Sequence, residues 1–372
     1  MSRVSTEGGR LWHVARADAV NVVSVDPSAT LILVGDLAGH AVLLDAEDGR
    51  SRAELADHPL GVLAAAWSPD GRIVVVGGAD GSVHGYDRHG QRLWSVQRSG
   101  WTGAVAWSPD GAVAALSIGR NVTLTAADGS WVRDLGAQPS SVTDLVWAGG
   151  RSAGRQPMLG VACYGGVRWF DVLNDEPAAD TGQYTAEGGL QPTRVFAWQG
   201  SLLCLTVAPD GRWVASGNQD ASVHIWRLWS ASDAEMTGYP SKVTELAWDH
   251  TGRWLAVGSA PVVTLWDHRG RGPQGRRPVT LEGHTETVTA LAWSPASTML
   301  LAGAADGRLL CWPFTRTRGH TPRTVATCPA RISRLTVAAD EQLLIADDAG
   351  GVQAVDLAQA LEDPAASTRT VR

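Results

Sequence analysis

The amino-acid sequence predicts an all-β protein, an eight-bladed β-propeller with four antiparallel strands in each blade. Three observations predict it: a turn motif that recurs about every forty residues, strand-like segments between its copies, and an N-terminal segment that matches an internal one. Units of that length with four strands each are typical of propeller blades. With 372 residues, 44% of them apolar, the chain is long enough to bury a large core.

The turn motif is W-S-P-D-G, at Trp67–Gly71 and again from Trp107. Successive copies are 40 to 45 residues apart, except for one gap of 60 residues between Trp147 and Val207. A second landmark, the end of a later strand, follows each copy at a nearly constant offset. The eight copies begin at Val25, Trp67, Trp107, Trp147, Val207, Trp248, Trp293 and Val337.

Each unit has the pattern of strands. Side chains alternate with a period of two up to Trp67, and Pro-Asp-Gly then favours a tight turn, because Pro presets φ and Gly adopts a positive φ. The β-branched segment 73–76 suits a strand buried on both faces. A second turn at Ala79–Gly81 and two further strand-like segments complete the unit.

The repeats resemble the WD40-repeat family over residues 10 to 357. The motifs that carry the resemblance are Ile225-Trp226, Leu265-Trp266-Asp267, Trp169-Phe170-Asp171, Gly283-His284 and the turns at Ala79–Gly81 and Ala304–Gly307. The resemblance implies a closed ring. Residues Arg10–Val14 match Arg92–Val96 at four of five positions, so we expect the first strand to complete the last blade. Seven blades are the alternative if the first or third repeat is irregular.

The predicted organisation is a single domain. We expect a flexible N-terminus at residues 1–9, the propeller at 10–357, an exposed insertion loop at 174–192 and a frayed tail at 358–372.

The 17 tryptophans include two sets at fixed repeat positions. We interpret both sets as packing between blades; an aromatic binding surface is the alternative interpretation. The sets are Trp67, Trp107, Trp147, Trp248 and Trp293, and Trp169, Trp226, Trp266 and Trp312.

The family resemblance also implies a hydrogen-bond network of Asp, His, Ser or Thr and Trp in each blade. The set is incomplete here, for example at Ala302, where the family has Ser or Thr. We interpret the remaining members as structural, because Asp side chains in turns cap backbone N–H groups. These members are Asp80, Asp220, Asp306 and His284.

Two loop surfaces are candidate binding sites. On the face built by the loops between blades and the turns between second and third strands, aromatic and Arg residues are typical interface anchors. The alternative is that each residue only covers its own loop. The candidate residues on this face are Leu60, Trp101, Arg120, Tyr164, Gln219 and Tyr239.

On the opposite face two neighbouring blades carry Arg-rich loops, the first without an acidic residue. This patch predicts an acidic partner or a nucleic-acid backbone, with a solvated face of mobile loops as the alternative interpretation. The net charge of −7 argues against nucleic acid as the main partner. The patch consists of Arg269, Arg271, Arg276, Arg277, Arg316, Arg318 and Arg323.

The sequence contains no recognised catalytic motif, and we predict neither enzyme activity, nor a cofactor, nor a metal site. A propeller hydrolase or lactonase is the main alternative, since Asp144, Thr244 and Glu245 lie on predicted inner strands. Four dispersed cysteines without a C-x-x-C motif favour free thiols and a cytoplasmic location. No segment predicts a signal peptide or a membrane span.

Together these features predict a binding platform for a protein or peptide, present as a monomer or as a subunit of a larger complex.

Overall fold

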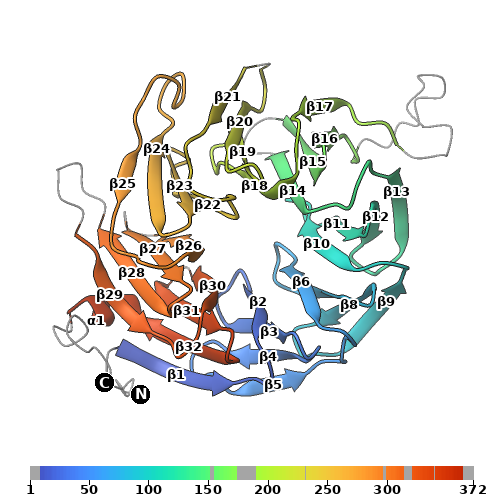
Figure 1. Ribbon diagram of the computed structural model, residues 1–372. Helices are drawn as coiled ribbons and strands as arrows, with labels where there is room; N and C mark the ends of the chain where they lie inside the picture. Colours follow the sequence, from blue (N-terminus) through green and yellow to red (C-terminus); the bar gives the residue numbers. More distant parts are fainter. Residues whose placement is uncertain are drawn as a thin grey trace.

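The computed structural model describes residues 9–150, 155–173, 190–230, 232–295, 299–313, 321–338 and 340–362. Eight four-stranded antiparallel sheets lie around a common centre (Figure 1). The predicted eight-bladed propeller is therefore confirmed, and the seven-bladed alternative is wrong. In each blade the first strand of the repeat lies next to the centre and the fourth forms the outer rim.

Blades 1 to 4 follow the chain in order, each from its inner to its outer strand. Their strands are β2 (Val20–Val25), β3 (Leu31–Asp36), β4 (Ala41–Asp45) and β5 (Ser51–Glu54); β6 (Val62–Trp67), β7 (Ile73–Gly78), β8 (Ser82–Asp87) and β9 (Arg92–Gln97); β10 (Thr102–Trp107), β11 (Val113–Ile118), β12 (Asn121–Ala126) and β13 (Trp131–Ala137); and β14 (Asp144–Gly150), β15 (Arg155–Cys163), β16 (Gly166–Phe170) and β17 (Arg194–Ala197).

Blades 5 to 8 continue the ring, and the last takes its outer strand from the N-terminus. Their strands are β18 (Leu202–Val207), β19 (Trp213–Asn218), β20 (Val223–Arg227) and β21 (Asp233–Met236); β22 (Glu245–Trp248), β23 (Trp254–Ser259), β24 (Val262–Asp267) and β25 (Val279–Leu281); β26 (Val288–Trp293), β27 (Met299–Ala304), β28 (Arg308–Pro313) and β29 (Arg323–Thr327); and β30 (Ile332–Val337), β31 (Gln342–Asp347), β32 (Gly351–Asp356) and β1 (Arg10–Ala15).

The ring closes where β1 pairs with β32, with Trp12 opposite Ala354. The indole Nε1 of Trp12 donates a hydrogen bond to the carbonyl of Ala46 in blade 1 at 2.9 Å, and the amide of Gln342 donates to the same carbonyl at 2.8 Å. The first strand thus covers the edge of β32, completes blade 8 and also contacts blade 1.

The W-S-P-D-G motif forms the turn between the first and second strands. In blade 2 the Ser68 hydroxyl donates to Asp70 at 2.6 Å and accepts the N–H of Ile73 at 3.0 Å, while Gly71 has a φ of 68°. The second copy of the motif repeats these bonds from Ser108. Side-chain bonds of this kind satisfy turn amides, which explains why the motif marks each repeat.

Tryptophans that end inner strands join neighbouring blades. In four of them the indole Nε1 donates to a backbone carbonyl of the preceding blade at 3.1 to 3.2 Å. Each carbonyl belongs to the residue before the equivalent position of that blade, so the contact repeats around the ring. The pairs are Trp67 with Ser24, Trp107 with Ala66, Trp147 with Ala106 and Trp293 with Ala247.

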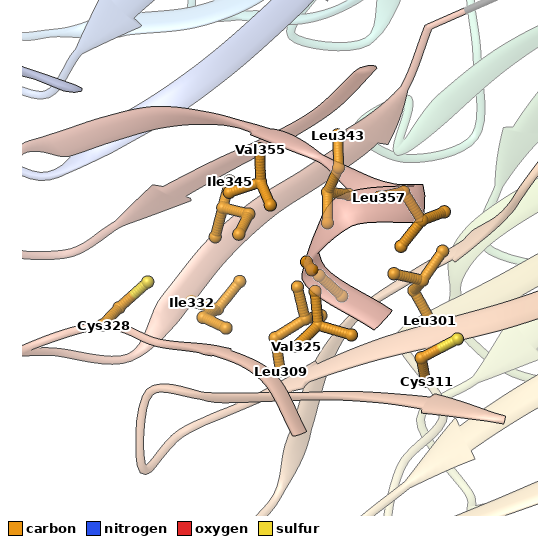
Figure 2. Packing of buried hydrophobic residues seen from close by; sticks show 12 residues of the cluster. Leu301, Leu309, Cys311, Val325, Cys328, Ile332, Leu343, Ile345, Val355 and Leu357 are labelled. Carbon is orange, nitrogen blue, oxygen red and sulfur yellow. The ribbon is translucent and has the colours of Figure 1, made fainter. Parts of the chain in front are cut away.

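The C-terminal end of the described chain differs from the expected tail. Residues 357–362 form helix α1 (Leu357–Glu362), and Leu357 and Ala360 are buried. Figure 2 shows Leu357 pointing into an apolar cluster with Leu301, Leu309 and Val325. Helix α1 was not predicted, because it is only six residues long and is held by packing against distant strands. Of the other expected segments, residues 1–8, 174–189 and 363–372 lie outside the described residues.

Candidate partner-binding face

One face of the ring, here called the loop face, is formed by the loops between blades and by the turns between second and third strands. In the described part of this face, the exposed large apolar side chains all belong to blades 1 to 4 or to the loops between them. They are Leu37 (45% exposed), Leu60 (79%), Trp101 (48%) and Tyr164 (59%).

Leu60 occupies a strained backbone position. The N–H of Gly61 donates to the carbonyl of His58 at 3.0 Å, and the φ of Leu60 is 79°. Pro59 followed by a positive φ describes a type II turn, in which Gly normally takes the position of Leu60. A left-handed conformation costs a bulky residue roughly 1–2 kcal/mol. Strain of this kind, on a side chain that packs little surface, indicates a functional constraint.

The strained turn is held by both neighbouring turns. The N–H of His58 donates to Gly39 at 2.9 Å, and the N–H of Ala79 donates to Gly61 at 2.9 Å. Gly61 also lies against the backbone of Leu37, because a Cβ at this position would come 3.4 Å from the Cα of Leu37. Leu37 and Leu60 are therefore neighbours on a rigid surface.

The same kind of contact continues toward blade 4. The carbonyl of Trp101 accepts the N–H of Gly119 at 2.9 Å, which places the Trp101 loop beside the turn that carries Arg120. The Nε of Arg120 donates to the carbonyl of Gln138 at 2.8 Å. Further along that loop, the Ser140 hydroxyl accepts the N–H of Tyr164 at 2.8 Å.

Arg120 consequently lies between two exposed aromatic residues. Its terminal guanidinium nitrogens have no partner among the described residues, and the side chain is exposed. We call Leu37, Leu60, Trp101, Arg120 and Tyr164 the exposed strip.

Two predicted residues of this face lie outside the exposed strip. Gln219 is exposed in blade 5, where its N–H donates to Ser201 at 3.1 Å. Tyr239 was expected at an exposed position, but it is largely buried: its hydroxyl accepts the indole N–H of Trp266 at 2.9 Å, and burial raises its pKa to about 12. Tyr239 is therefore a packing residue, because its hydroxyl satisfies a repeat tryptophan.

Comparison with known proteins agrees with this architecture. The model of the WD domain, G-beta repeat, matches residues 49–87, 190–227, 232–267 and 275–313. The chain belongs to the WD40-repeat family. A solved structure of similar fold is that of the computationally designed Ika8 protein, with a TM-score of 0.74 and 20% identity over 94% of this chain and 99% of that one.

Three relatives share parts of the WD40 ring. Actin-interacting protein 1 of Caenorhabditis elegans is 24% identical over 119 residues, 32% of this chain and 20% of that protein. Protein FIZZY-RELATED 3 of Arabidopsis thaliana is 28% identical over 230 residues, 59% and 42% respectively. Cell division cycle 20.5, cofactor of APC complex, also of Arabidopsis thaliana, is 34% identical over 124 residues, 32% and 26%. The WD40 chain thus spans less than half the length of these relatives.

The hydrogen-bond network expected for WD40 blades is present only in fragments. In blade 2, Nδ1 of His58 lies 2.7 Å from the Ser82 hydroxyl, which donates to Asp80 at 2.7 Å. Burial lowers the pKa of His58 to about 4, so the ring is neutral. In blade 5 the Ser222 hydroxyl donates to Asp220 at 2.6 Å.

In blade 7 the network lacks its hydroxyl. Nε2 of His284 lies 3.1 Å from the carbonyl of Ala302, while Asp306 accepts the N–H of Arg308 at 3.0 Å. The indole nitrogen of the buried Trp312 has no hydrogen-bond partner within the described residues. Ala302, at the position where the family has Ser or Thr, explains this because it offers no hydroxyl to accept the indole N–H.

The repeat tryptophans lie in the interior of the WD40 ring. Six of them are at most 9% exposed: Trp67, Trp107, Trp169, Trp226, Trp248 and Trp312. The other three, Trp147, Trp266 and Trp293, are half-buried.

The predicted Arg patch on the opposite face is partly compensated. Asp267, just before the first Arg-rich loop, forms ion pairs with Arg253 at 2.9 Å, Arg269 at 3.1 Å and Arg276 at 3.3 Å. Burial alone would raise the pKa of Asp267, but hydrogen bonds from Arg253 and Arg269 lower it to about 2. Arg269 and Arg276 are therefore paired with an acid of the same chain, which stands just before the loop.

The other arginines of the patch differ in whether they have a bonding partner. Arg323 donates to the carbonyl of Leu361 at 3.0 Å and so caps the end of helix α1. Arg271 and Arg277 are exposed and have no ion pair within the described part of the chain. Arg316 and Arg318 lie outside the described residues.

Asp144 and Glu245, on inner strands, are the acids on which the alternative of a propeller hydrolase or lactonase depends. Both oxygens of Asp144 accept backbone N–H groups, from Leu145 at 2.8 Å and from Leu205 of blade 5 at 2.9 Å. Burial raises the pKa of Asp144 to about 6, and burial raises that of Glu245 to about 7 against the opposing effect of Arg334. The geometry of Asp144 is that of a bridge between blades 4 and 5.

The described residues contain no group of three or more His, Cys, Asp or Glu side chains placed to hold a metal ion. In the same residues no helix is long and apolar enough to cross a membrane.

Leu37 was not predicted, although it stands in a turn between second and third strands, as Tyr164 and Gln219 do. Leu37 stands in the turn between the second and third strands of blade 1, so an apolar residue there was a detectable signal. The strain at Leu60 could have been suspected from Pro-Leu-Gly, which places a leucine at the glycine position of a turn.

Proposed function

We propose that this WD40 protein is a non-catalytic interaction platform and that the exposed strip binds a protein or peptide partner. The observation that carries the proposal is Leu60, which is 79% exposed and held in a left-handed conformation by a hydrogen-bonded turn. Within the described residues the Leu60 side chain is little buried, so packing does not offset the strain. A partner that covers the leucine would offset it, because burial of one such side chain contributes roughly 1.5–3 kcal/mol.

The rigidity of the strip supports this function. Its loops are joined to one another by backbone hydrogen bonds from Gly39 to Tyr164, so binding orders few groups. Exposed aromatic and Arg residues are frequent hot spots of protein interfaces. The names of two relatives, an actin-interacting protein and a cofactor of the APC complex, point to interaction with other proteins.

The alternatives receive less support. The two oxygens of Asp144 are both used by backbone N–H groups, which favours a structural role over acid–base catalysis. Ion pairs with Asp267 and the cap of helix α1 occupy three Arg of the opposite face, which weakens the case for nucleic acid or an acidic partner there.

Leu60 provides the test. Leu60→Ala keeps the left-handed position but removes the side chain, and Leu60→Gly removes both strain and side chain. We expect both variants to lose the protein that wild type captures from the native cell. Leu60→Gly is also expected to be at least as stable as Leu60→Ala, because relief of strain offsets the entropy of glycine.

Leu93→Ala is the matched control, since Leu93 is an exposed leucine on the outer strand β9, away from the strip. Capture of the same protein by wild type, both Leu60 variants and the control alike would contradict the proposal.

We further propose a cytoplasmic location and a role as monomer or subunit of a larger complex. The free state of Cys163, Cys204, Cys311 and Cys328 supports a reducing compartment. Cell fractionation followed by thiol labelling of the unfolded protein tests it; a disulfide in the native protein would contradict it.

A further inference from the structure

We propose that Arg120 binds a carboxylate of the partner, so that the exposed strip recognises an Asp or Glu flanked by apolar residues. This inference rests on the proposed function and specifies the chemistry of the partner. The feature that carries it is the placement of Arg120 between Trp101 and Tyr164 on one continuous, hydrogen-bonded surface.

The guanidinium of Arg120 is oriented in advance. Its Nε donates to the carbonyl of Gln138, and the N–H of Gln138 donates back to the carbonyl of Arg120, both at 2.8 Å. This reciprocal pair fixes the side chain near its end, and the two terminal nitrogens keep N–H groups that this bond does not use. Two parallel N–H groups on a planar fork match the two oxygens of a carboxylate.

The surroundings of Arg120 lack a competing acid. The loop-face segments at 98–101, 119–120, 138–143 and 164–165 contain Arg98 and Arg120 but no Asp or Glu. This contrasts with the Arg-rich loop on the opposite face, where Asp267 already pairs with three Arg. The cationic group in the strip is therefore available to a partner, and the local charge favours an anionic one.

The two aromatic side chains define what flanks the acid. Trp101 is 48% exposed and Tyr164 is 59% exposed, and each is held at its backbone by a bond to the neighbouring turn. Large rigid rings on either side of a guanidinium exclude water from the ion pair once a partner covers them, which strengthens it. A peptide that fits this surface has apolar side chains on both sides of the carboxylate.

The test uses a displayed library of random 12-residue peptides selected on the wild-type protein. We expect the selected peptides to share an Asp or Glu with apolar neighbours. For a synthesised member, Arg120→Gln is expected to raise Kd by roughly 10- to 100-fold, as loss of a charged hydrogen bond does. Replacement of the acidic residue by its amide in the peptide should raise Kd by a similar factor, and the two changes together should add little more.

Further variants and a salt series separate the contribution of the Arg120 charge from that of its planar shape. Arg120→Lys is expected to bind with intermediate Kd, because lysine keeps the charge and loses the fork. The dependence of Kd on NaCl concentration should be smaller in Arg120→Gln than in wild type. The control is Arg72→Gln, which removes the same charge from the opposite face. Thermal unfolding of each variant shows whether the fold is retained.

Several outcomes overturn the inference. They are selected peptides without an acid, no selected peptide at all, a Kd for Arg120→Gln within twofold of wild type, or a phosphoserine peptide bound more than tenfold more tightly than the Glu peptide. If the Leu60 variants lose binding while Arg120→Gln keeps it, the proposed function stands and only the carboxylate site fails. If the Leu60 variants also keep their cellular partner, both fail.

Discussion

The two halves of the ring share one scaffold but differ in how they use aromatic residues on the loop face. In blades 1 to 4, Trp101 and Tyr164 are exposed beside a strained, exposed Leu60. In blades 5 to 8 the comparable loop aromatic, Tyr239, folds inward and its hydroxyl accepts the N–H of Trp266. The difference teaches that a repeated sheet fixes where loops stand, while single loop residues decide whether a surface packs or binds.

The largest effect is expected from two tryptophans, one in each half. Trp12→Ala removes a buried ring and its hydrogen bond to Ala46, so the free energy of unfolding should fall by about 3–5 kcal/mol. Trp101→Ala removes an exposed ring and should change stability by less than about 0.5 kcal/mol. Urea unfolding followed by circular dichroism measures both; equal losses would show that Trp101 also packs.

A second expected effect is a pH-dependent loss of stability caused by Glu245 on the inner strand of blade 6. Glu245 in blade 6 stands three residues before Trp248, where blade 3 has Ala104 before Trp107. Burial raises the pKa of Glu245 from its usual 4.5 to about 7, so the folded protein holds its proton more tightly than the unfolded chain. The charged carboxylate therefore lowers the free energy of unfolding, and this loss is complete above pH 7. The loss disappears as pH falls from 7 toward 4.5.

Glu245→Gln should consequently be more stable than wild type by about 3 kcal/mol at pH 8, with a difference that nearly vanishes at pH 4.5. Unfolding free energies at a series of pH values test this. Glu235→Gln, which removes an exposed acid of blade 5, serves as the control. A difference that stays constant across the pH range would refute the shifted titration.

The smallest change in stability is expected when Tyr239 and Tyr164 are each replaced by phenylalanine. Tyr239→Phe leaves the Nε1 of Trp266 without its acceptor, and the expected loss of stability is about 1 kcal/mol. Tyr164→Phe in blade 4 should leave stability unchanged, because its hydroxyl makes no hydrogen bond within the described residues. Thermal unfolding measures both. An equal shift in the two variants would remove the distinction between the halves.

Much of the fold followed from the sequence because its signals are local. The Ser, Asp and Gly of each turn bond to one another within a few residues, and the match between the segments at Arg10 and Arg92 identifies equivalent outer strands. Helix α1 was missed because Leu357 and Ala360 are held by packing against distant strands, which no local pattern records.

The candidate site was predicted less completely, since exposure depends on neighbours in space. The loop position of Tyr239 gave no sign that Trp266, distant in sequence, would take its hydroxyl. The pairing of Asp267 with Arg253 and Arg276 likewise brings together residues from the turn, the strand end and the loop. Leu60 and Trp101 were predicted from residue type and loop position alone, and both are exposed in the structure.

The pairing of β1 with β32 has a consequence for biosynthesis. Of the described strands, the one around Trp12 is made first and the strand at Val352–Val355 that receives it is made last. Until β32 has been made, seven sheets can assemble while the eighth is incomplete, and its unpaired backbone is exposed to other nascent chains or to chaperones. We expect the cooperative gain in protease resistance to appear only after β32 has been synthesised.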